Sequence, residues 1–338
     1  MNPILDWGIN FIAGLQTSAP WLAAPSHFFS FLGTQEFYLF ILPFLCWCVD
    51  IRLGLRFGVI LTVSDSLNTF FKFVFHQPRP YWVSDKLRVI TAEASYGFPS
   101  GHAQHAMTVW GTMAACGKGW LRWLMAALIF LIGYSRIVLA VHFPTDVLAG
   151  WLIGALILWA FLKWETAVIG WFNRFTLAQK IVLAFSASML LLTVSLAGLA
   201  FVPPADPPQW EITAARVFSL APGQAAIQPR VTAGAFGAMG TFFGLVAGAI
   251  LIFQRGGFDA GGMWWKRAVR FMVGVIGLAI LWWGLRMVFP RDASLVSQVL
   301  RYVRYALTGF WVTYGAPWVF IKLGLQNTTK VLDQAVPK

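Results

Sequence analysis

The sequence predicts an all-α fold, a bundle of membrane-spanning helices in a polytopic integral membrane protein. Of the 338 residues, 58% are hydrophobic and only 11% are charged, and the mean hydropathy is +0.68. A soluble globular domain carries about 25% charged and about 45–50% apolar residues. The 30 Phe and 18 Trp add apolar surface that a water-facing chain would not carry. The composition therefore excludes a soluble enzyme, a disordered chain and a collagen-like fibre.

Apolar runs long enough to cross a membrane recur along the chain. A spanning helix needs roughly 20 mostly apolar residues, and about nine segments meet this requirement. Their ranges are 34–49, 54–75, 100–117, 121–140, 145–163, 181–202, 232–254, 268–289 and 305–324. We expect an interfacial N-terminal segment (1–33), a core of about five spans (34–163) and a C-terminal extension of about four spans (164–338). The longest hydrophilic loop, 203–230, starts with prolines, which predict a non-helical beginning.

The distribution of basic residues predicts how the chain crosses the membrane. No Lys or Arg precedes Arg52, and with the N-terminus outside, more than half of the 25 basic residues fall in inner loops. The positive-inside rule therefore favours an outer N-terminus and a cytoplasmic C-terminus. A net charge of +12 would suggest nucleic acid in a soluble protein. Here the cations are dispersed between apolar runs, so we expect no nucleic-acid partner.

Three short segments carry ionisable residues at the ends of predicted spans. They are Lys72 to Arg79-Pro80, then Pro99-Ser100-Gly101-His102, and then Ser135-Arg136 followed by His142 and Asp146. An ionisable group within a span is energetically expensive, and it indicates a functional site by default. On the predicted topology all three segments lie at the outer face, so we expect them to form one site.

The cations and the helix start in these segments predict a phosphate-binding site. Lys72, Arg79 and Arg136 have no matching carboxylate nearby in the predicted arrangement. Arg binds phosphate oxygens through a planar fork of N–H donors, while Lys supplies a point charge. Ser100 and Gly101 stand where the third span begins. Free backbone N–H groups and the positive end of the helix dipole favour an anion there.

Two histidines beside this phosphate site suggest nucleophilic catalysis. His142 lies four residues before Asp146, and Pro144 between them suits the first turn of a helix. Asp146 can therefore hold one imidazole N–H and leave the other nitrogen free to attack phosphorus. His102 has no such partner in the sequence, and we expect it to protonate the leaving alkoxide.

The order Lys-x6-Arg-Pro, Pro-Ser-Gly-His and Ser-Arg-x5-His-x3-Asp resembles the complete signature of the type 2 phosphatidic acid phosphatase superfamily. This superfamily includes lipid phosphate phosphatases, polyprenyl pyrophosphate phosphatases, glucose-6-phosphatase and vanadium haloperoxidases. The resemblance, over about residues 34–163, implies a metal-independent phosphohydrolase with a phosphohistidine intermediate and no cofactor. It implies His142 as the nucleophile, Asp146 as its partner and His102 as the acid. The residues it assigns to phosphate binding are Lys72, Arg79, Ser100, Gly101 and Arg136.

The residues around the signature resemble two different branches of the superfamily. Asp65, Leu67-Asn68 and Arg79-Pro80-Tyr81-Trp82 look like the glucose-6-phosphatase branch. Tyr96-Gly97-Phe98 and Ala103-Gln104 look more like polyprenyl pyrophosphate and sphingoid-phosphate phosphatases. The substrate therefore stays open at this point.

Polar residues close to the motifs allow structural and functional interpretations. Asp65 lies seven residues before Lys72 on the same helical stripe, where it either bonds to Asn68 or Ser64 or supports Lys72 from outside the phosphate site. His105 follows His102 at a spacing that a metal pair could use. We expect no metal, because no third ligand is apparent and three cations would repel one. Asp65, Asn68 and His105 are therefore candidates for a supporting layer around the site.

These observations predict an integral membrane phosphatase acting at the outer membrane face. A phosphorylated lipid or prenyl pyrophosphate is the first choice of substrate, because spans at the bilayer surface can admit a chain sideways. The alternatives are a glucose-6-phosphatase-like hydrolase of a soluble sugar phosphate, and a transporter or scaffold with an inactive phosphate site. We expect a bacterial inner membrane with a periplasmic site, or the endoplasmic reticulum with a lumenal one. The substrate and the lipid bilayer are the expected partners, and the oligomeric state is not predicted.

Overall fold

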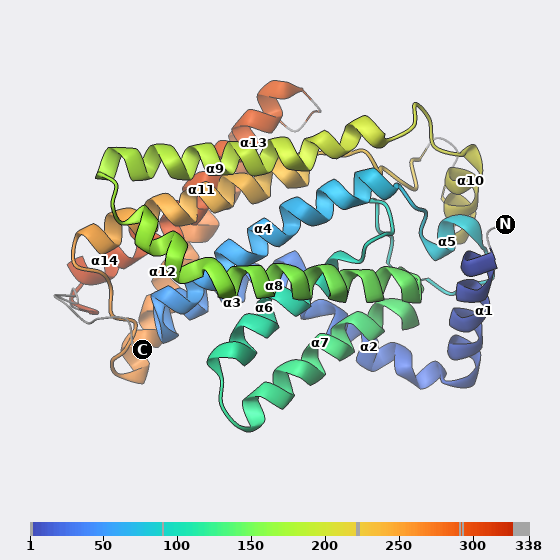
Figure 1. Cartoon of the computed structure of the whole chain (residues 1–338), viewed down its shortest axis with the longest axis horizontal. Helices are drawn as coiled ribbons and strands as arrows, with labels where there is room; N and C mark the ends of the chain where they lie inside the picture. Colours follow the sequence, from blue (N-terminus) through green and yellow to red (C-terminus); the bar gives the residue numbers. More distant parts are fainter. Residues whose placement is uncertain (1–2, 90, 221–223, 291, 293, 327–338) are drawn as a thin grey trace. The chain divides into compact units, whose positions relative to one another are not determined.

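The computed structural model describes residues 3–89, 91–220, 224–290, 292 and 294–326, and all regular secondary structure in them is helical (Figure 1). The α-helices are α1 (Pro3–Ser18), α2 (Ala23–Phe31), α3 (Gln35–Phe44), α4 (Ile51–Phe75), α5 (Pro80–Val83), α6 (Gly101–Cys116), α7 (Trp120–Val138), α8 (Pro144–Phe172), α9 (Leu177–Ala197), α10 (Pro208–Val217), α11 (Ala233–Gln254), α12 (Trp264–Val288), α13 (Leu295–Phe310) and α14 (Ala316–Lys322). The predicted all-α fold class is confirmed.

Six stretches within these residues are long and apolar enough to cross a membrane. They are Ile51–Val83, Trp120–Val138, Pro144–Phe172, Leu177–Phe201, Ala233–Gln254 and Trp264–Val288. The number rises to as many as seven if the bent pair Pro20–Phe31 and Gln35–Val49 is one span. Several apolar helices of this length are what a multi-pass membrane protein requires.

The predicted count of nine spans is not confirmed. The predicted span 100–117 is α6, a helix of only 16 residues. Its length is about 24 Å at about 1.5 Å per residue, short of a hydrocarbon core of about 30 Å. The predicted span 305–324 is divided by a π-helical turn, Trp311–Gly315, between α13 and α14. The sequence predicts on which side of the membrane each chain end lies, but both ends lie outside the described residues.

The chain divides into two compact units. The first unit comprises 1–38, 64–163 and 194–232, and the second comprises 39–63, 164–193 and 233–338. All three motif segments lie in the first unit. The part of the hydrophilic loop that contains α10 also belongs to the first unit, although the sequence places it in the C-terminal extension.

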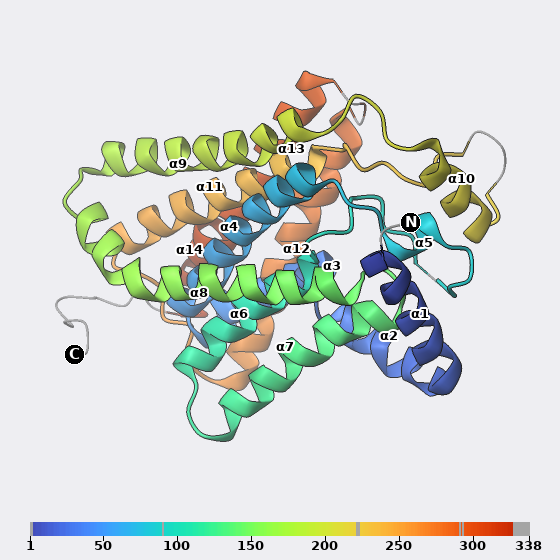
Figure 2. The ribbon, with the colours of Figure 1, turned by 45° about the vertical axis from the view of Figure 1, so that its right-hand side comes forward.

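Within the first unit, α6, α7 and the N-terminal part of α8 lie side by side (Figures 1 and 2). Two glycines of α8 bring its backbone close to α6. A Cβ atom on Gly150 would lie 2.6 Å from the carbonyl oxygen of Ser100, and one on Gly154 would lie 2.7 Å from that of Gln104. Small residues spaced four apart permit this close approach. The packing therefore holds the start of α6 next to the start of α8.

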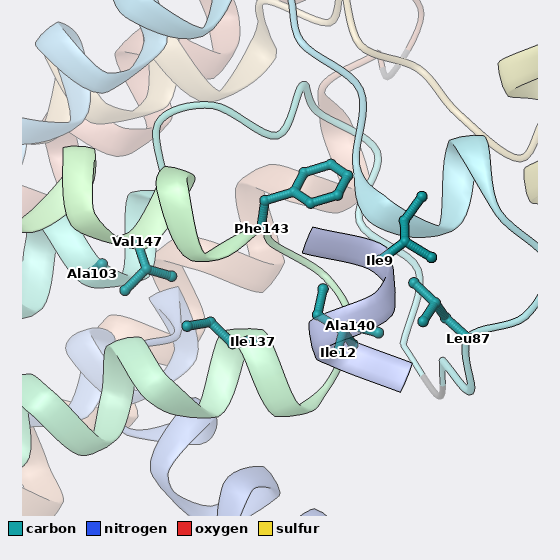
Figure 3. Close-up of a cluster of buried hydrophobic side chains, with 8 residues drawn as sticks. All are labelled: Ile9, Ile12, Leu87, Ala103, Ile137, Ala140, Phe143 and Val147. Carbon is teal, nitrogen blue, oxygen red and sulfur yellow. The ribbon is translucent and has the colours of Figure 1, made fainter. Parts of the chain in front are cut away.

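A hydrophobic cluster supports the segment that leads into α8 (Figure 3). Ile9 and Ile12 of α1 pack with Leu87, Phe143 and Val147 there, and all five are buried. Burying a side chain the size of Phe contributes about 1.5–3 kcal/mol to folding. Because Phe143 follows His142 directly in the chain, this cluster fixes the backbone that carries His142.

A second cluster packs α10 and its loop against α5. Trp82 and Tyr96 are fully buried there with Ala214 of α10. The hydroxyl of Tyr96 donates to Oδ1 of Asp206 at 2.7 Å, and Arg230 donates through Nε to Oδ2 of the same carboxylate at 3.1 Å. The hydrophilic loop begins without a helix before α10, as its prolines predict. It covers the backbone between the first two motifs.

Candidate active site

His142 lies between a cation and a carboxylate, and all three side chains are buried. Its Nδ1 is 3.2 Å from Oδ2 of Asp146, and its Nε2 is 3.2 Å from Nη1 of Arg79. Since Arg only donates hydrogen bonds, Nε2 accepts, and Nδ1 carries the proton directed at Asp146. This tautomer places the imidazole lone pair on Nε2, on the side of Arg79.

The local chain folds so that Asp146 reaches back to His142. Asp146 lies in the first turn of α8, which begins at Pro144. Its Oδ2 also accepts from the backbone N–H of Phe143 at 2.9 Å, as a side chain near a helix start does. Its carbonyl oxygen accepts from the backbone N–H of Ser100 at 3.0 Å. This last bond joins the second motif to the third.

The other two cations of the motifs, Lys72 and Arg136, contact the loop that leads to the second motif. Lys72, near the end of α4, donates through Nζ to the carbonyl oxygen of Tyr96. That carbonyl also accepts from Nη2 of Arg79 at 3.4 Å. Arg136, at the end of α7, donates through Nη1 to the hydroxyl of Ser30 on α2 and through Nη2 to Glu93. The structure therefore brings all three predicted cations around residues 93–96.

The start of α6 presents polar groups that have no partner in the described part of the chain. Oγ of Ser100 and Nε2 of His102 are both buried and make no hydrogen bond there. The backbone at Gly101 lies close to Asn68, since a Cβ on it would be only 3.1 Å from Oδ1 of Asn68. Buried polar atoms are normally hydrogen-bonded. These two atoms are therefore candidate ligands for an anion bound at the N-terminus of α6.

Glu93 corrects the expectation that the cations have no carboxylate near them. Its Oε1 forms an ion pair with Nη2 of Arg136, and its Oε2 is 3.7 Å from Nη2 of Arg79. Glu93 was not predicted from the sequence, because it lies in a polar loop without periodicity or motif. Ser30, in the predicted interfacial segment, was not predicted either. One signal was available, since Glu93 and Asp85 are the acidic residues between the first two motifs.

The electrostatics of the site keep Glu93 ionised and His142 neutral. Burial raises the pKa of the Glu93 carboxyl, but Arg79 and Arg136 outweigh it and hold that pKa well below its usual range. Burial lowers the pKa of the His142 imidazole, and Arg79 and Lys72 lower it further. A neutral imidazole has a free lone pair, so His142 is in the form that a nucleophile needs.

The predicted supporting residues form a separate network beside α6. Nδ1 of His105 is 3.0 Å from Oγ of Ser64, and its Nε2 is 3.4 Å from Oδ1 of Asp65. Asn68 donates through Nδ2 to Oε1 of Gln104 at 2.9 Å. Asp65 therefore pairs with His105. Among the described residues, no group of three His, Cys, Asp or Glu is placed to hold a metal.

Two parts of the chain match known protein families. Residues 53–170 match the model of the family described as "PAP2 superfamily". The chain carries a PAP2 superfamily domain. Residues 236–328 match a second model, "PAP2 superfamily phosphatase, transmembrane extension". The resemblance drawn from the three motifs is therefore confirmed, and this PAP2 protein is a multi-pass membrane protein.

Relatives of the PAP2 protein carry different names. It is 30% identical over 106 residues to undecaprenyl-diphosphatase of Sulfolobus acidocaldarius, covering 31% of this chain and 51% of that relative. It is 29% identical over 185 residues to glucose-6-phosphatase 3 of Bos taurus, covering 47% and 53% respectively. The crystal structure of Aquifex aeolicus LpxE matches with 26% identity and a TM-score of 0.42, over 46% of this chain and 95% of that one. The chain spans about half the length of the two curated relatives.

Proposed function

We propose that this PAP2 protein is an integral membrane phosphatase that hydrolyses a phosphate or pyrophosphate ester through a phosphohistidine intermediate. The observation that carries the proposal is the position of His142 between Arg79 and Asp146, at 3.2 Å from each. The Nδ1 proton faces Asp146, so the lone pair of Nε2 lies next to a permanent cation that would bind the phosphate under attack.

In the first step, Nε2 of His142 attacks the terminal phosphorus, and an N–P bond forms while the P–O bond to the leaving group breaks. His102 gives its proton to the departing oxygen, which leaves as an alcohol from a phosphate ester or as a prenyl phosphate from a pyrophosphate. Lys72, Arg79 and Arg136 stabilise the negative charge of the five-coordinate transition state, and such electrostatic stabilisation is usually the largest contribution to catalysis.

In the second step, water attacks phosphorus and the N–P bond breaks. His102, now neutral, takes a proton from that water, and inorganic phosphate leaves. Asp146 stabilises the positively charged imidazole of phosphorylated His142 between the two steps. Ser100 and the N-terminus of α6 at Gly101 donate hydrogen bonds to phosphate oxygens in both steps. We propose that neither metal nor cofactor takes part, because the three cations supply the positive charge and would repel a metal ion.

We propose a lipid-borne substrate, a phosphorylated lipid or a prenyl pyrophosphate. The site belongs to a chain embedded in the membrane, where an acyl or prenyl chain can approach through the bilayer. The similarity to undecaprenyl-diphosphatase supports this choice. The second candidate is a soluble sugar phosphate, which the similarity to glucose-6-phosphatase 3 over 185 residues favours.

We further propose that the site faces the outer or lumenal side, with the N-terminus on that side and the C-terminus in the cytoplasm. The excess of basic residues in alternate loops supports this orientation. The division into an N-terminal segment (1–33), a catalytic core (34–163) and an extension (164–338) remains part of the proposal. Labelling of Lys86→Cys and Lys163→Cys with an impermeant thiol reagent in intact cells tests the proposed orientation in the membrane. Labelling at residue 163 but not at residue 86 would invert the orientation.

The activity is tested with the purified full chain and a panel of phosphatidic acid, prenyl pyrophosphate and glucose 6-phosphate. We expect hydrolysis that survives EDTA and is inhibited by vanadate, which adopts the geometry of the transition state. The value of kcat/KM ranks the substrates, and the His142→Ala variant is the control. Binding of phosphate without hydrolysis of any substrate would contradict the proposal and favour a transporter or scaffold. Loss of activity in EDTA with recovery on adding divalent ions would contradict the metal-free mechanism.

A further inference from the structure

The guanidinium group of Arg79 has its donors fully directed at the protein itself. Nε donates to the carbonyl oxygen of Ser95 at 2.7 Å, and Nη2 donates to its hydroxyl at 3.1 Å and to the carbonyl of Tyr96. Nη1 donates to the carbonyl of Val141 at 2.9 Å and to Nε2 of His142. A guanidinium has five N–H donors. A phosphate can therefore bind Arg79 only by replacing acceptors that the protein already supplies.

Among the residues that the structure describes, Glu93 is the carboxylate that forms ion pairs with both Arg79 and Arg136. Its carboxylate lies between Arg136 and Arg79, the two arginines that the proposed mechanism gives to phosphate. A carboxylate and a phosphate present similar oxygen pairs to a guanidinium fork. Glu93 therefore places its negative charge beside the two arginines, where a bound phosphate would place its own.

The two sides of this contact differ in how firmly they are held. Arg79 and Arg136 are 1% and 5% exposed, whereas the side chain of Glu93 is 29% exposed. Arg136 is also held by Ser30. The backbone of Glu93 is fixed, because its N–H and its carbonyl both bond to the hydroxyl of Tyr81 at 2.8 Å. The carboxylate can thus swing toward solvent from a fixed backbone while the arginines stay in place.

We propose that Glu93 competes with the phosphate group for Arg79 and Arg136, and thereby sets how tightly the site holds inorganic phosphate. This inference rests on the proposed function of the site. An arriving phosphate ester, with its greater negative charge, displaces the carboxylate from the arginines. After hydrolysis the carboxylate returns to the two arginines and neutralises part of their positive charge. Inorganic phosphate is then held less tightly and dissociates more easily. Glu93 is in this sense a residue that limits product affinity.

The experiment compares inorganic phosphate binding by the purified full chain and by its Glu93→Gln variant. Gln keeps the size and one oxygen acceptor but removes the charge. Removing a like charge a few ångströms from the anion should tighten binding about tenfold. We expect the inhibition constant of phosphate to fall by that factor, and isothermal titration calorimetry with phosphate to give the same change. The Glu36→Gln variant removes the same charge at an exposed position of α3 and should bind phosphate like the wild type.

The opposite result has a clear meaning. If Glu93 only positions the two arginines, the Glu93→Gln variant will bind phosphate more weakly, and either weaker or unchanged binding overturns the proposal. Glu93→Gln leaves Arg136 buried without its carboxylate, so Glu93→Asp serves as a second variant that keeps this ion pair's charge. Asp keeps the charge but retracts it by one methylene, and we expect binding between those of wild type and Glu93→Gln. Calorimetry measures phosphate binding without turnover. A wild-type protein that hydrolyses no substrate would therefore refute the proposed function, while the comparison of phosphate binding would still test the proposed role of Glu93.

Discussion

Two helix pairs, one in each compact unit, use the same packing device but differ in what they hold. In the first unit, Gly150 and Gly154 bring α8 against α6. In the second unit, Gly240 and Gly244 bring α11 against α13, where added Cβ atoms would lie 2.3 Å and 1.9 Å from carbonyl oxygens of the partner helix (Figure 1). Both pairs depend on small residues spaced four apart.

Each unit also holds a buried arginine, and the two arginines have different surroundings. In the first unit, Arg79 contacts the imidazole of His142, which is also held by Asp146. In the second unit, Arg270 donates to the carbonyl oxygens of Ala260 and Gly261, at 2.8 Å and 2.7 Å. An imidazole held between a cation and a carboxylate can react, whereas the hydrogen bonds of Arg270 join α12 to the loop that precedes it. We therefore expect substitutions in the first unit to change turnover and substitutions in the second to change stability.

The largest expected effect in the first unit is that of His142→Ala. Without the nucleophile no phosphohistidine can form, so kcat should fall by at least about 10⁴-fold, as when a catalytic nucleophile is removed from other hydrolases. Steady-state assays on the natural substrate measure this, with His27→Ala on α2 as the control. Turnover within tenfold of the wild type would remove His142 from the mechanism.

The next effect is that of His102→Ala, which removes the proposed acid. Loss of a general acid typically slows a reaction about 10²–10⁴-fold. The loss should shrink for aryl phosphates, whose leaving groups need no proton, so the ratio between alkyl and aryl substrates is the informative measurement. Equal losses on both substrate types would mean that His102 binds phosphate without protonating the leaving group.

The Asp146→Asn variant should lower kcat by about 10²-fold or more, because the amide can hold His142 in the wrong tautomer. Attack requires neutral His142, and burial beside Arg79 and Lys72 lowers the pKa of this imidazole. The acid limb of kcat/KM should therefore lie below the ordinary value of about 6.5. Since a carboxylate favours the protonated imidazole, its removal should move the limb to still lower pH. Normal kcat and an unmoved limb would reduce Asp146 to a cap of α8.

The smallest effect tests the comparison of the two units directly. Gly150→Ala and Gly244→Ala should each destabilise the protein by about 1–3 kcal/mol through overpacking. Gly150→Ala should also displace Ser100, and a shift of about 1 Å at a site costs up to about 10²-fold in rate. Thermal unfolding and kcat of the folded fraction separate the two properties. Loss of kcat in Gly244→Ala as large as in Gly150→Ala would mean that the second unit takes part in the site.

Some contacts between motif residues could be predicted from the sequence, because the spacing of these residues along the chain determines which of them can meet. A proline at the first turn of α8 and a carboxylate four residues after His142 suffice to predict their pairing, at 3.2 Å. The family and the all-helical fold followed from the motifs and the composition. Glu93 could not be predicted, because its role depends on a loop that carries it between Arg79 and Arg136. The number of membrane spans could not be predicted from hydropathy either, because α6 is apolar but only 16 residues long.

Trapping the phosphorylated enzyme tests the proposed mechanism at its decisive step. The full chain is mixed with a ³²P-labelled substrate, quenched within milliseconds, digested and analysed by mass spectrometry under alkaline conditions that preserve phosphohistidine. We expect a phosphoryl group on Nε2 of His142, which forms and decays at rates compatible with kcat and is absent from the His142→Ala variant. Full turnover with no labelled protein at any quench time, or a label on another residue, would contradict it.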